Sequence, residues 1–425
     1  MTSPRRARLW WIAAPAVLIW SVAGLAGPVL ATSGVNQRAP QRFTTAALEA
    51  GAGARPAGCA VSASDAAHCF LSLRRAPAPT RAAIRPADCA VDESAGYTPC
   101  NIQDAYGLTK LSLKRGKGQT VAVVDAFDDP DAESDLATYR STYGLPACTT
   151  ADGCFAKVNQ EGVQGDYPSP DAGWASEISL DLDMVSAVCP KCHVLLVEAN
   201  DNGNALFSAE QEAVSLGATV VSNSWGFGEF DGEQGFDGAL DTPGIAITFS
   251  SGDGAYAGGV QYPSASPYVT SVGGTQLTPT ANARGWTEKT WVTPGKPPTQ
   301  GSGSGCSSFE PKPSWQTDAG CPARTTADVS AVAADVLGYD TYEAGGWYYF
   351  FGTSVSSPVI AGAYGLAGNA SGATTPASIA YANPSKLRDI KSGKTGSCSP
   401  AYLCTAGAGY DGPTGLGVPK GVGGF

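Results

Sequence analysis

The chain has 425 residues, 43% of them hydrophobic and only 15% charged. It is long enough for a large buried core and too apolar for a disordered or coiled-coil protein. Residues 1–88 carry ten Arg, no Lys and three acids, a net charge of +7, whereas residues 89–425 carry a net charge of −18. An acidic body repels phosphate, which argues against nucleic acid as a partner. The excess of acidic residues is consistent either with a role in solubility or with activity at low pH.

Residues 1–31 have the pattern of an export signal. Three Arg before residue 9 are followed by an apolar run that ends at Ala31, where small residues suit signal-peptide cleavage. The run is also long enough to remain as a membrane anchor. With cleavage after Ala31, we expect a secreted, extracellular protein without stable membrane association.

The next segment, residues 32–88, is rich in Ala, Pro and Arg and has little periodicity. It predicts a short pro-segment or linker rather than a folded domain. The residue composition changes near Cys89, and residues 89–425 are expected to form one domain.

Within residues 89–425, short apolar runs alternate with helical patterns. Strands are expected at residues 119–125, 193–198, 218–222 and 245–250, and helices at residues 177–188 and 205–216. This alternation predicts an α/β fold with a mainly parallel central sheet flanked by helices.

The twelve cysteines form close pairs in the sequence, which in an oxidising compartment suggests local disulfides. The pairs are Cys59/Cys69, Cys89/Cys100, Cys148/Cys154, Cys189/Cys192, Cys306/Cys321 and Cys398/Cys404. Cys189 and Cys192 are also spaced like half of a zinc site, with His193 adjacent. No second pair of this spacing completes four ligands.

A candidate nucleophile lies in the string Gly352-Thr353-Ser354, which leads into a run of small residues from Val359 to Ala370. A serine at the start of a helix lies where the helix N-terminus stabilises negative charge on a neighbouring oxygen. The alternative is an ordinary helix cap. A serine nucleophile also needs a base, and the chain has only two histidines, His68 and His193.

Neither histidine is well placed to be that base. His68 lies in the Arg- and Pro-rich stretch before the main domain, and His193 begins an apolar run, where we expect a packed core residue. Asp125, at the end of the first expected strand, is interpreted as structural. The base is therefore expected to be a carboxylate.

Two carboxylates lie four residues apart on the expected helix that contains Glu177 and Asp181, so they share one face. The flanking positions are apolar, which predicts a buried helix. Buried carboxylates are unfavourable unless they are hydrogen-bonded or protonated, and neighbouring acids raise each other's pKa. Asp183 points elsewhere. The alternative is a solvated acidic face.

These motifs, taken in order, resemble the sedolisin family of serine-carboxyl peptidases, within the subtilisin-like clan. The resemblance covers roughly residues 95–422. It rests on Glu177 and Asp181, on Ser222–Gly226, on Ser250–Gly254, on Tyr262–Thr275, on Ala327–Ala331 and on Gly352–Ser354.

The resemblance implies a subtilisin-like three-layer fold and peptide hydrolysis at acidic pH. It implies that Ser354 attacks the scissile carbonyl, that Glu177 is the general base and that Asp181 hydrogen-bonds Glu177. Asp253 would be part of the oxyanion hole, beside the backbone N–H of Ser354. A carboxyl group donates a hydrogen bond only when protonated, which agrees with an acidic optimum.

The resemblance also implies a substrate-binding strand and a calcium site. The strand comprises Ser222, Asn223, Ser224, Trp225 and Gly226. The Ca²⁺ ligands would be the carboxylates of Asp389 and Asp411 and the carbonyls of Ile390, Gly407 and Gly409. Such an oxygen shell suits Ca²⁺.

Sedolisins usually carry a long folded pro-domain, and the roughly 57 residues between the expected cleavage site and Cys89 are too few and too polar for one. The sequence thus predicts a secreted, monomeric peptidase that acts on proteins or peptides. Endopeptidase and tripeptidyl-peptidase action stay open. The alternatives are a neutral subtilisin-like peptidase and a catalytically silent secreted binding protein on the same fold.

Overall fold

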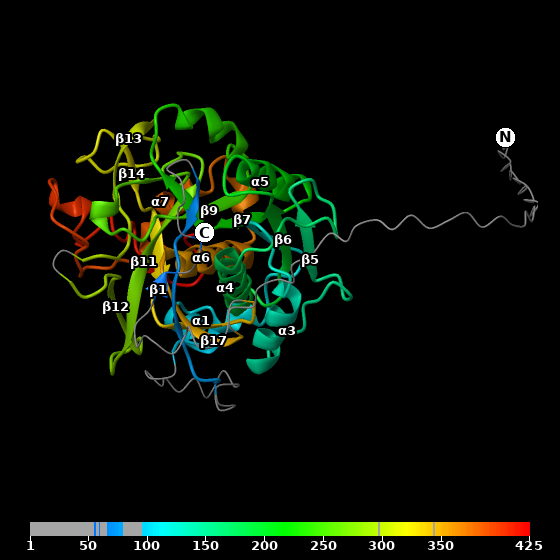
Figure 1. Ribbon diagram of the computed structural model, residues 1–425. Helices are drawn as coiled ribbons and strands as arrows, with labels where there is room; N and C mark the ends of the chain where they lie inside the picture. Colours follow the sequence, from blue (N-terminus) through cyan, green and yellow to red (C-terminus); the bar gives the residue numbers. More distant parts are fainter. Residues whose placement is uncertain (1–54, 57–58, 60–65, 80–95, 296–297, 343–344) are drawn as a thin grey trace, which may run out of the picture. The chain divides into compact units, whose positions relative to one another are not determined.

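A computed structural model of the chain describes residues 55–56, 59, 66–79, 96–295, 298–342 and 345–425 (Figure 1). The expected export signal, residues 1–31, lies outside the described residues. The described residues all belong to one contact unit, Phe43–Phe425. Within them, no helix combines the length and the apolar character that crossing a bilayer requires.

Eight strands form a mainly parallel central sheet, in the order β12-β11-β9-β7-β4-β6-β5, with β15 beside β11. All neighbours are parallel except β11 and β12. The strands are β4 (Thr120–Ala126), β5 (Phe155–Asn159), β6 (His193–Ala199), β7 (Val220–Asn223), β9 (Ala246–Ser250), β11 (Thr270–Pro279), β12 (Trp286–Thr290) and β15 (Val329–Val332). Unbroken apolar runs such as 121–124 form strands here because helices cover both faces.

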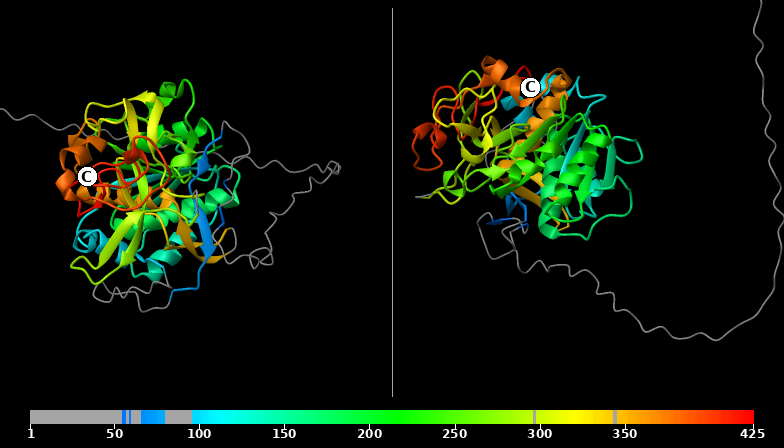
Figure 2. Two further views of the ribbon diagram at one scale, coloured as in Figure 1. Left: turned by 90° about the vertical axis from the view of Figure 1, so that its left-hand side faces the viewer. Right: turned by 90° about the horizontal axis from the view of Figure 1, so that it is seen from above.

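Helices α4 (Ala172–Val188) and α6 (Thr353–Ala367) pack against each other on one face, and α5 (Ala205–Ser215) covers the opposite face (Figures 1 and 2). Glycines allow α6 to approach closely, because a Cβ on Gly362 would lie 2.7 Å from the Val188 side chain. The other helices are α1 (Pro99–Ala105), α2 (Thr109–Ser112), α3 (Ala132–Thr142) and α7 (Ala377–Ala382). Short 3-10 turns are η3 (Glu233–Ala239), η4 (Tyr256–Gly258), η5 (Ala370–Gly372), η6 (Pro384–Lys386) and η7 (Ala401–Leu403).

Two smaller sheets draw strands from the N-terminal part of the chain. The four-stranded sheet has the order β1-β3-β17-β16, and the three-stranded sheet has the order β10-β8-β2. Their strands are β1 (Arg55–Pro56), β2 (His68–Cys69), β3 (Ser72–Arg75), β8 (Trp225–Gly228), β10 (Gln261–Tyr262), β16 (Val336–Asp340) and β17 (Gly346–Phe351). Two further pairs are β13 (Gly305–Pro311) with β14 (Ala323–Thr326) and β18 (Leu387–Arg388) with β19 (Val418–Pro419).

The predicted fold class is confirmed, and the expected strands and helices form with shifted ends. Helix α4 begins five residues earlier than expected, because Asp171 caps it by accepting hydrogen bonds from the backbone N–H groups of Gly173 and Trp174. The expectation for His193 is wrong. This residue is exposed at the first position of β6, where Nδ1 lies 3.0 Å from the Gly153 carbonyl oxygen.

Five of the expected local disulfides form among the described residues: Cys59–Cys69, Cys148–Cys154, Cys189–Cys192, Cys306–Cys321 and Cys398–Cys404. Cys100 is also disulfide-bonded, and Cys89 lies outside the described residues. The disulfide of Cys189 and Cys192 removes both thiolates, so the zinc alternative is wrong.

Candidate active site

Ser354 lies in the first turn of α6, directly after a turn that requires glycine. Gly352 has φ 131°, and a Cβ there would lie 2.0 Å from the carbonyl oxygen of Phe70. Ser354 is fully buried, and its hydroxyl donates to the Ser224 carbonyl at 3.3 Å. The residue therefore presents its Oγ and its backbone N–H at the N-terminus of a buried helix.

A proline inside α6 ties this turn to the neighbouring strand. Pro358 has no N–H for the carbonyl of Ser354, the acceptor four residues earlier. The Ser224 hydroxyl oxygen lies 3.4 Å from that carbonyl oxygen. Ser224 thus contacts the candidate nucleophile through both its hydroxyl and its carbonyl group.

Glu177 lies on α4, which is buried on nearly all sides because α1, α3, α6 and β16 pack around it. Neither carboxylate oxygen of Glu177 has a hydrogen bond of normal geometry among the described residues. Burial raises the pKa of Glu177 well above its ordinary value, and the nearby carboxyls of Asp181 and Asp125 raise it further. The adjacent Ser354 hydroxyl lowers the pKa of Glu177, because it interacts favourably with the carboxylate. An acid with so little solvation is able to hold a proton.

Asp181, one helical turn after Glu177, contacts a different group from the one expected. Both of its carboxylate oxygens accept the Ser224 hydroxyl at 2.8 Å. Burial raises the pKa of Asp181 well above its ordinary value, against this hydrogen bond. Asp181 acts on Glu177 through its charge, which raises the pKa of Glu177.

Asp125 extends this group of acids, which the sequence interpretation as a structural residue did not foresee. It is fully buried at the end of β4, and neither carboxylate oxygen has a partner among the described residues. Burial raises the pKa of Asp125 well above its ordinary value, and the charges of Asp181 and Glu198 add to the shift. Its signal in the sequence is a carboxylate that ends an otherwise apolar run.

Asp253 approaches the start of α6 from the other side. Its Oδ1 accepts from the backbone N–H of Thr353 at 2.8 Å and from the Thr353 hydroxyl at 2.9 Å. Its Oδ2 lies 2.6 Å from the Cβ position of Gly352, the same point that the Phe70 carbonyl oxygen approaches. Burial raises the pKa of Asp253 to about 8, against the hydrogen bonds from Thr353. Asp253 is therefore able to be protonated and to donate a hydrogen bond to an oxygen near the Gly352 Cβ position.

The five residues of the expected substrate strand divide into two groups. Ser222 and Asn223 lie inside the central sheet, in β7, between β4 and β9. Trp225 is buried, and its Nε1 donates to the Val124 carbonyl at 3.0 Å. The backbone from Ser224 to Gly226 lies outside the central sheet and pairs with β2 and Phe70.

The Ala327–Ala331 motif runs into β15, which packs against α6. Asp328 accepts from the backbone N–H of Ser271 at 2.8 Å and forms a fully buried ion pair with Arg324 at 2.5 Å. Removing one partner of such a pair leaves an uncompensated charge and costs about 3–5 kcal/mol. The motif therefore holds the start of β11 in place.

The two carboxylates expected to bind calcium come together near the C-terminus. Asp389 accepts from the backbone N–H of Gly409 at 3.0 Å, and Asp411 accepts from that of Gly407 at 2.9 Å. Burial and the neighbouring Asp389 raise the pKa of Asp411 to about 7. Asp389 Oδ1 is buried without a partner among the described residues, and Ile390 follows directly. An orphaned carboxylate oxygen beside a second carboxylate fits a hard cation.

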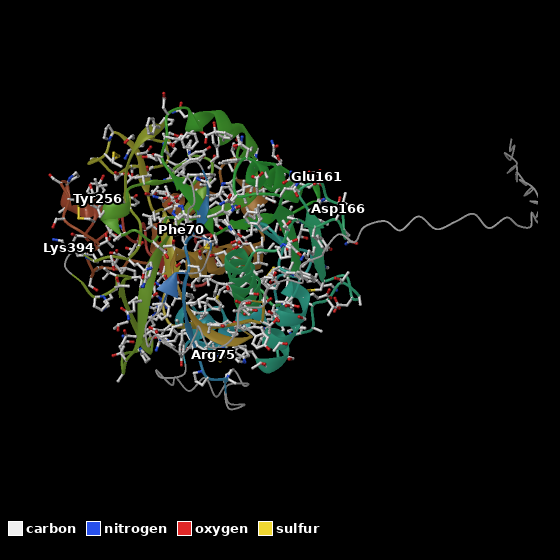
Figure 3. All side chains as sticks on the ribbon, in the orientation of Figure 1. Phe70, Arg75, Glu161, Asp166, Tyr256 and Lys394 are labelled. Carbon is white, nitrogen blue, oxygen red and sulfur yellow. A yellow bond between two sulfur atoms is a disulfide. The ribbon has the colours of Figure 1, made fainter. Side chains whose placement is uncertain are left out.

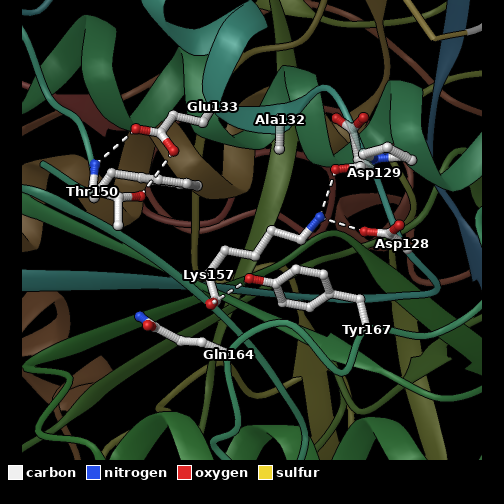
Figure 4. Close-up of a pocket in the computed structure, with 10 residues that line it drawn as sticks. Asp128, Asp129, Ala132, Glu133, Thr150, Lys157, Gln164 and Tyr167 are labelled. Atoms are coloured by element: carbon white, nitrogen blue, oxygen red, sulfur yellow. Dashed lines mark hydrogen bonds and ion pairs between the residues drawn. The ribbon is translucent and has the colours of Figure 1, made fainter.

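A separate hollow of about 340 Å³ lies at the β5 edge of the central sheet (Figure 4). Lys157 points into it and is 3.0 Å from the Glu198 carboxylate. The same ammonium also bonds the Asp128 carboxylate and the Asp129 carbonyl (Figure 4). This hollow is an ion-paired recess, and Ser354 is not among its lining residues.

Comparison with known proteins decides the family. The family model described as the subtilase family matches residues 164–390, just over half of the chain. This chain belongs to the subtilase family. The matched range of this subtilase includes Glu177, Asp181, Asp253 and Ser354.

The resemblance of this subtilase to the sedolisins is also confirmed. It is 29% identical over 364 residues to kumamolisin of Bacillus sp. (strain MN-32), covering 77% of this chain and 62% of that protein. It is 28% identical over 373 residues to sedolisin of Pseudomonas sp. (strain 101), covering 76% of this chain and 59% of that protein. The chain thus spans about three fifths of the length of these relatives.

A solved structure gives the same relationship. Pseudomonas sedolisin, a serine-carboxyl proteinase complexed with two molecules of pseudo-iodotyrostatin, superposes with a TM-score of 0.66 and 27% sequence identity. The match covers 76% of this chain and 95% of the sedolisin chain. The subtilisin-like arrangement of sheet and helices is therefore shared with that protein.

Proposed function

We propose that this subtilase is a secreted serine-carboxyl peptidase that hydrolyses peptide bonds at acidic pH. One observation carries the proposal. Ser354 lies at a helix N-terminus beside buried carboxyls with raised pKa values, and no imidazole hydrogen-bonds it among the described residues. His193 is exposed at β6, and His68 pairs through its backbone with Gly226.

In the proposed reaction, Ser354 Oγ attacks the scissile carbonyl and its proton moves to Glu177. Glu177 then returns that proton to the leaving amine. Asp181 holds Ser224, which accepts from the Ser354 hydroxyl, so it orients the nucleophile through that serine. Protonated Asp253 and the backbone N–H of Ser354 stabilise the developing oxyanion.

The acidic optimum follows from the carboxyls. A carboxyl group donates a hydrogen bond only while protonated, and the pKa of Asp253, raised to about 8 by burial, keeps it a donor in acid. The buried acids around Glu177 raise one another's pKa, so they cannot all ionise together. A histidine base would be charged and inactive there.

The Ser354→Ala variant tests the proposal. After incubation at acidic pH, the wild-type protein should degrade a denatured protein substrate in the presence of pepstatin, and Ser354→Ala should abolish this activity. Ser308→Ala, at an exposed position on β13, is the matched control and should retain full activity. Product release at pH 3–8 is the measurement.

Two other outcomes correspond to the alternative functions. No hydrolysis at any pH by the wild-type protein would favour a silent secreted binding protein. Activity that peaks at alkaline pH and disappears in a His193→Ala variant would favour a neutral subtilisin-like peptidase. Either result would contradict the proposed acid peptidase.

We also propose that Asp389 and Asp411 hold a structural Ca²⁺ ion, together with carbonyls of Ile390, Gly407 and Gly409. The bound ion would tie the loop before β19 to the end of β18. Saturating Ca²⁺ at about a hundredfold above its Kd should raise the Tm by about 5 °C, since it stabilises the folded state by about 2.7 kcal/mol.

The calcium response should disappear in Asp411→Asn and persist in Asp231→Asn, at an exposed position. Differential scanning calorimetry of Ser354→Ala protein, with chelator and with added Ca²⁺, avoids self-digestion during the scan. A Tm that is unchanged by both additions would contradict this site.

A further inference from the structure

The cleft beside Ser354 contains a segment of the chain itself, residues 67–75. Ala67 N–H donates to the Asn202 carbonyl at 2.7 Å, and Phe70 N–H donates to the Ser224 carbonyl at 3.2 Å. Between them, His68 and Cys69 pair antiparallel with Gly226 and Trp225. The segment thus pairs with part of the backbone that the resemblance to sedolisins assigns to substrate binding.

The same segment continues past Ser354 onto a second strand. Ser72 to Arg75 pair antiparallel with β17, and Ser72 lies opposite Phe351, three residues before Ser354. Gln300 Nε2 donates to the Ser72 hydroxyl at 2.8 Å. Figure 3 shows Phe70 near the middle of the molecule and Arg75 toward its lower edge, in line with this path.

The Phe70 carbonyl lies against the N-terminus of α6. The backbone N–H of Ser354 donates to it at 3.3 Å. A Cβ on Gly352 would lie 2.0 Å from this oxygen and 2.6 Å from Asp253 Oδ2, so the carbonyl and the carboxyl approach one point. The Phe70 carbonyl oxygen therefore lies close to the two groups that we propose as oxyanion donors, the Ser354 N–H and the Asp253 carboxyl.

The Phe70 side chain fills a pocket built around glycines. Its ring atoms lie 2.9 Å from the Cβ position of Gly226 and 3.6 Å from that of Gly252. The residue is only 2% exposed, and the His68 ring meets its ring edge-on at 4.8 Å. The adjoining cavity, of about 450 Å³, continues along Gly258 and Gln261. A side chain larger than glycine at position 226 or 252 would displace the aromatic ring of Phe70.

A disulfide closes the segment over the carboxyls. Cys59 and Cys69 are bonded, and both Sγ atoms lie within 4.8 Å of a Glu177 carboxylate oxygen. The sulfurs cannot bind a metal as thiolates while they are bonded to each other. The disulfide instead covers Glu177, and the residue is fully buried.

We propose that residues 67–75 are a built-in substrate of this chain, that Phe70 occupies the primary specificity pocket, and that Phe70–Leu71 is the first bond cut. The proposal rests on the proposed peptidase function and deepens it by naming the substrate class. Peptides with an aromatic residue on the acyl side of the scissile bond fit this cleft. Until its own segment leaves, the cleft is closed to other peptides.

The proposed step needs no reagent besides water. Ser354 Oγ bonds to the Phe70 carbonyl carbon, the C–N bond to Leu71 breaks, and the serine proton passes through Glu177 to the Leu71 amine. Water then releases Phe70 as a free carboxylate and restores Ser354. The disulfide joins two residues on the acyl side, so it does not hold the released fragment to the rest of the protein.

The test uses the full chain, produced in an oxidising host and incubated at acidic pH. Intact-mass measurement and N-terminal sequencing should find a new terminus at Leu71 in the wild-type protein and none in Ser354→Ala. Phe70→Asp should slow the appearance of this terminus at least tenfold. Leu113→Ala, at an exposed position after α2, is the control and should behave like the wild type.

A second measurement does not depend on the folding of Phe70→Asp. Two external peptides that differ only at the residue before the scissile bond, Phe or Asp, are given to the processed enzyme. The kcat/KM should favour Phe at least tenfold, as expected for an apolar pocket. Hydrolysis with equal rates for the two peptides, or with a new terminus elsewhere and no cut at Phe70–Leu71, would overturn the inference and leave the peptidase function standing. If neither the wild-type protein nor any variant cuts any peptide, both the proposed peptidase function and the built-in substrate would be contradicted.

Discussion

Replacing Glu177 with glutamine should lower kcat for peptide hydrolysis roughly a thousandfold or more, with little change in KM. Glutamine keeps the size of the side chain but cannot accept the serine proton. The exchange also removes a buried acid that has no hydrogen-bond partner among the described residues, so the folded state should not lose stability. Steady-state kinetics at acidic pH, together with a thermal melt, measure both effects.

The matched control for this variant is Glu233→Gln. Glu233 is also fully buried, and burial raises its pKa to about 7, but it lies on η3 and accepts from the Phe230 N–H. Its replacement should leave kcat within about twofold of the wild type. Equal losses in the two variants would mean that any buried glutamate matters through folding alone, and Glu177 would lose its role as base.

The second large effect is expected at Asp253, where the donor can be removed or made independent of pH. Asp253→Ala should lower kcat by about 10²–10³ at acidic pH, where the wild-type carboxyl is protonated, which is the usual cost of losing one oxyanion donor. Asp253→Asn keeps an N–H donor in place. The acid has a pKa raised to about 8 by burial, so it donates below that value and loses its proton above it.

The sign of the pH effect follows directly. In the wild-type protein, the loss of the Asp253 proton should contribute to the fall of kcat on the alkaline side. In Asp253→Asn this contribution disappears, so the alkaline limb should shift to higher pH. Profiles of kcat from pH 3 to 9 for the three proteins provide the comparison. An alkaline limb that does not move in Asp253→Asn would exclude Asp253 as the titrating donor.

The sequence predicted much of the fold because the decisive signals are local. Apolar runs such as 120–126 identify the parallel strands, and the spacing of Glu177 and Asp181 places two acids on one helical face. Cysteines close in sequence are also close in space. The error at His193 arose because the first residue of a buried strand can still lie outside the sheet's covered faces.

The parts that the sequence did not predict depend on contacts between distant residues. Asp181 meets Ser224 rather than Glu177, because Ser224 belongs to the loop between β7 and β8, which passes the start of α6. Asp125 joins the acids only through the order of strands in the sheet. The pairing of residues 67–75 with β8 and β17 was not predicted, because these partner strands lie far away in the chain.

The disulfide between Cys59 and Cys69 makes the order of two chemical events matter. The bond forms only where thiols are oxidised, and its sulfurs then lie beside Glu177, the proposed general base. A chain that meets acid before its thiols are oxidised would leave Glu177 more accessible to water than a chain oxidised first. If residues 67–75 close the cleft as proposed, the redox history of the compartment, as well as its pH, would set how long the cleft stays closed after synthesis.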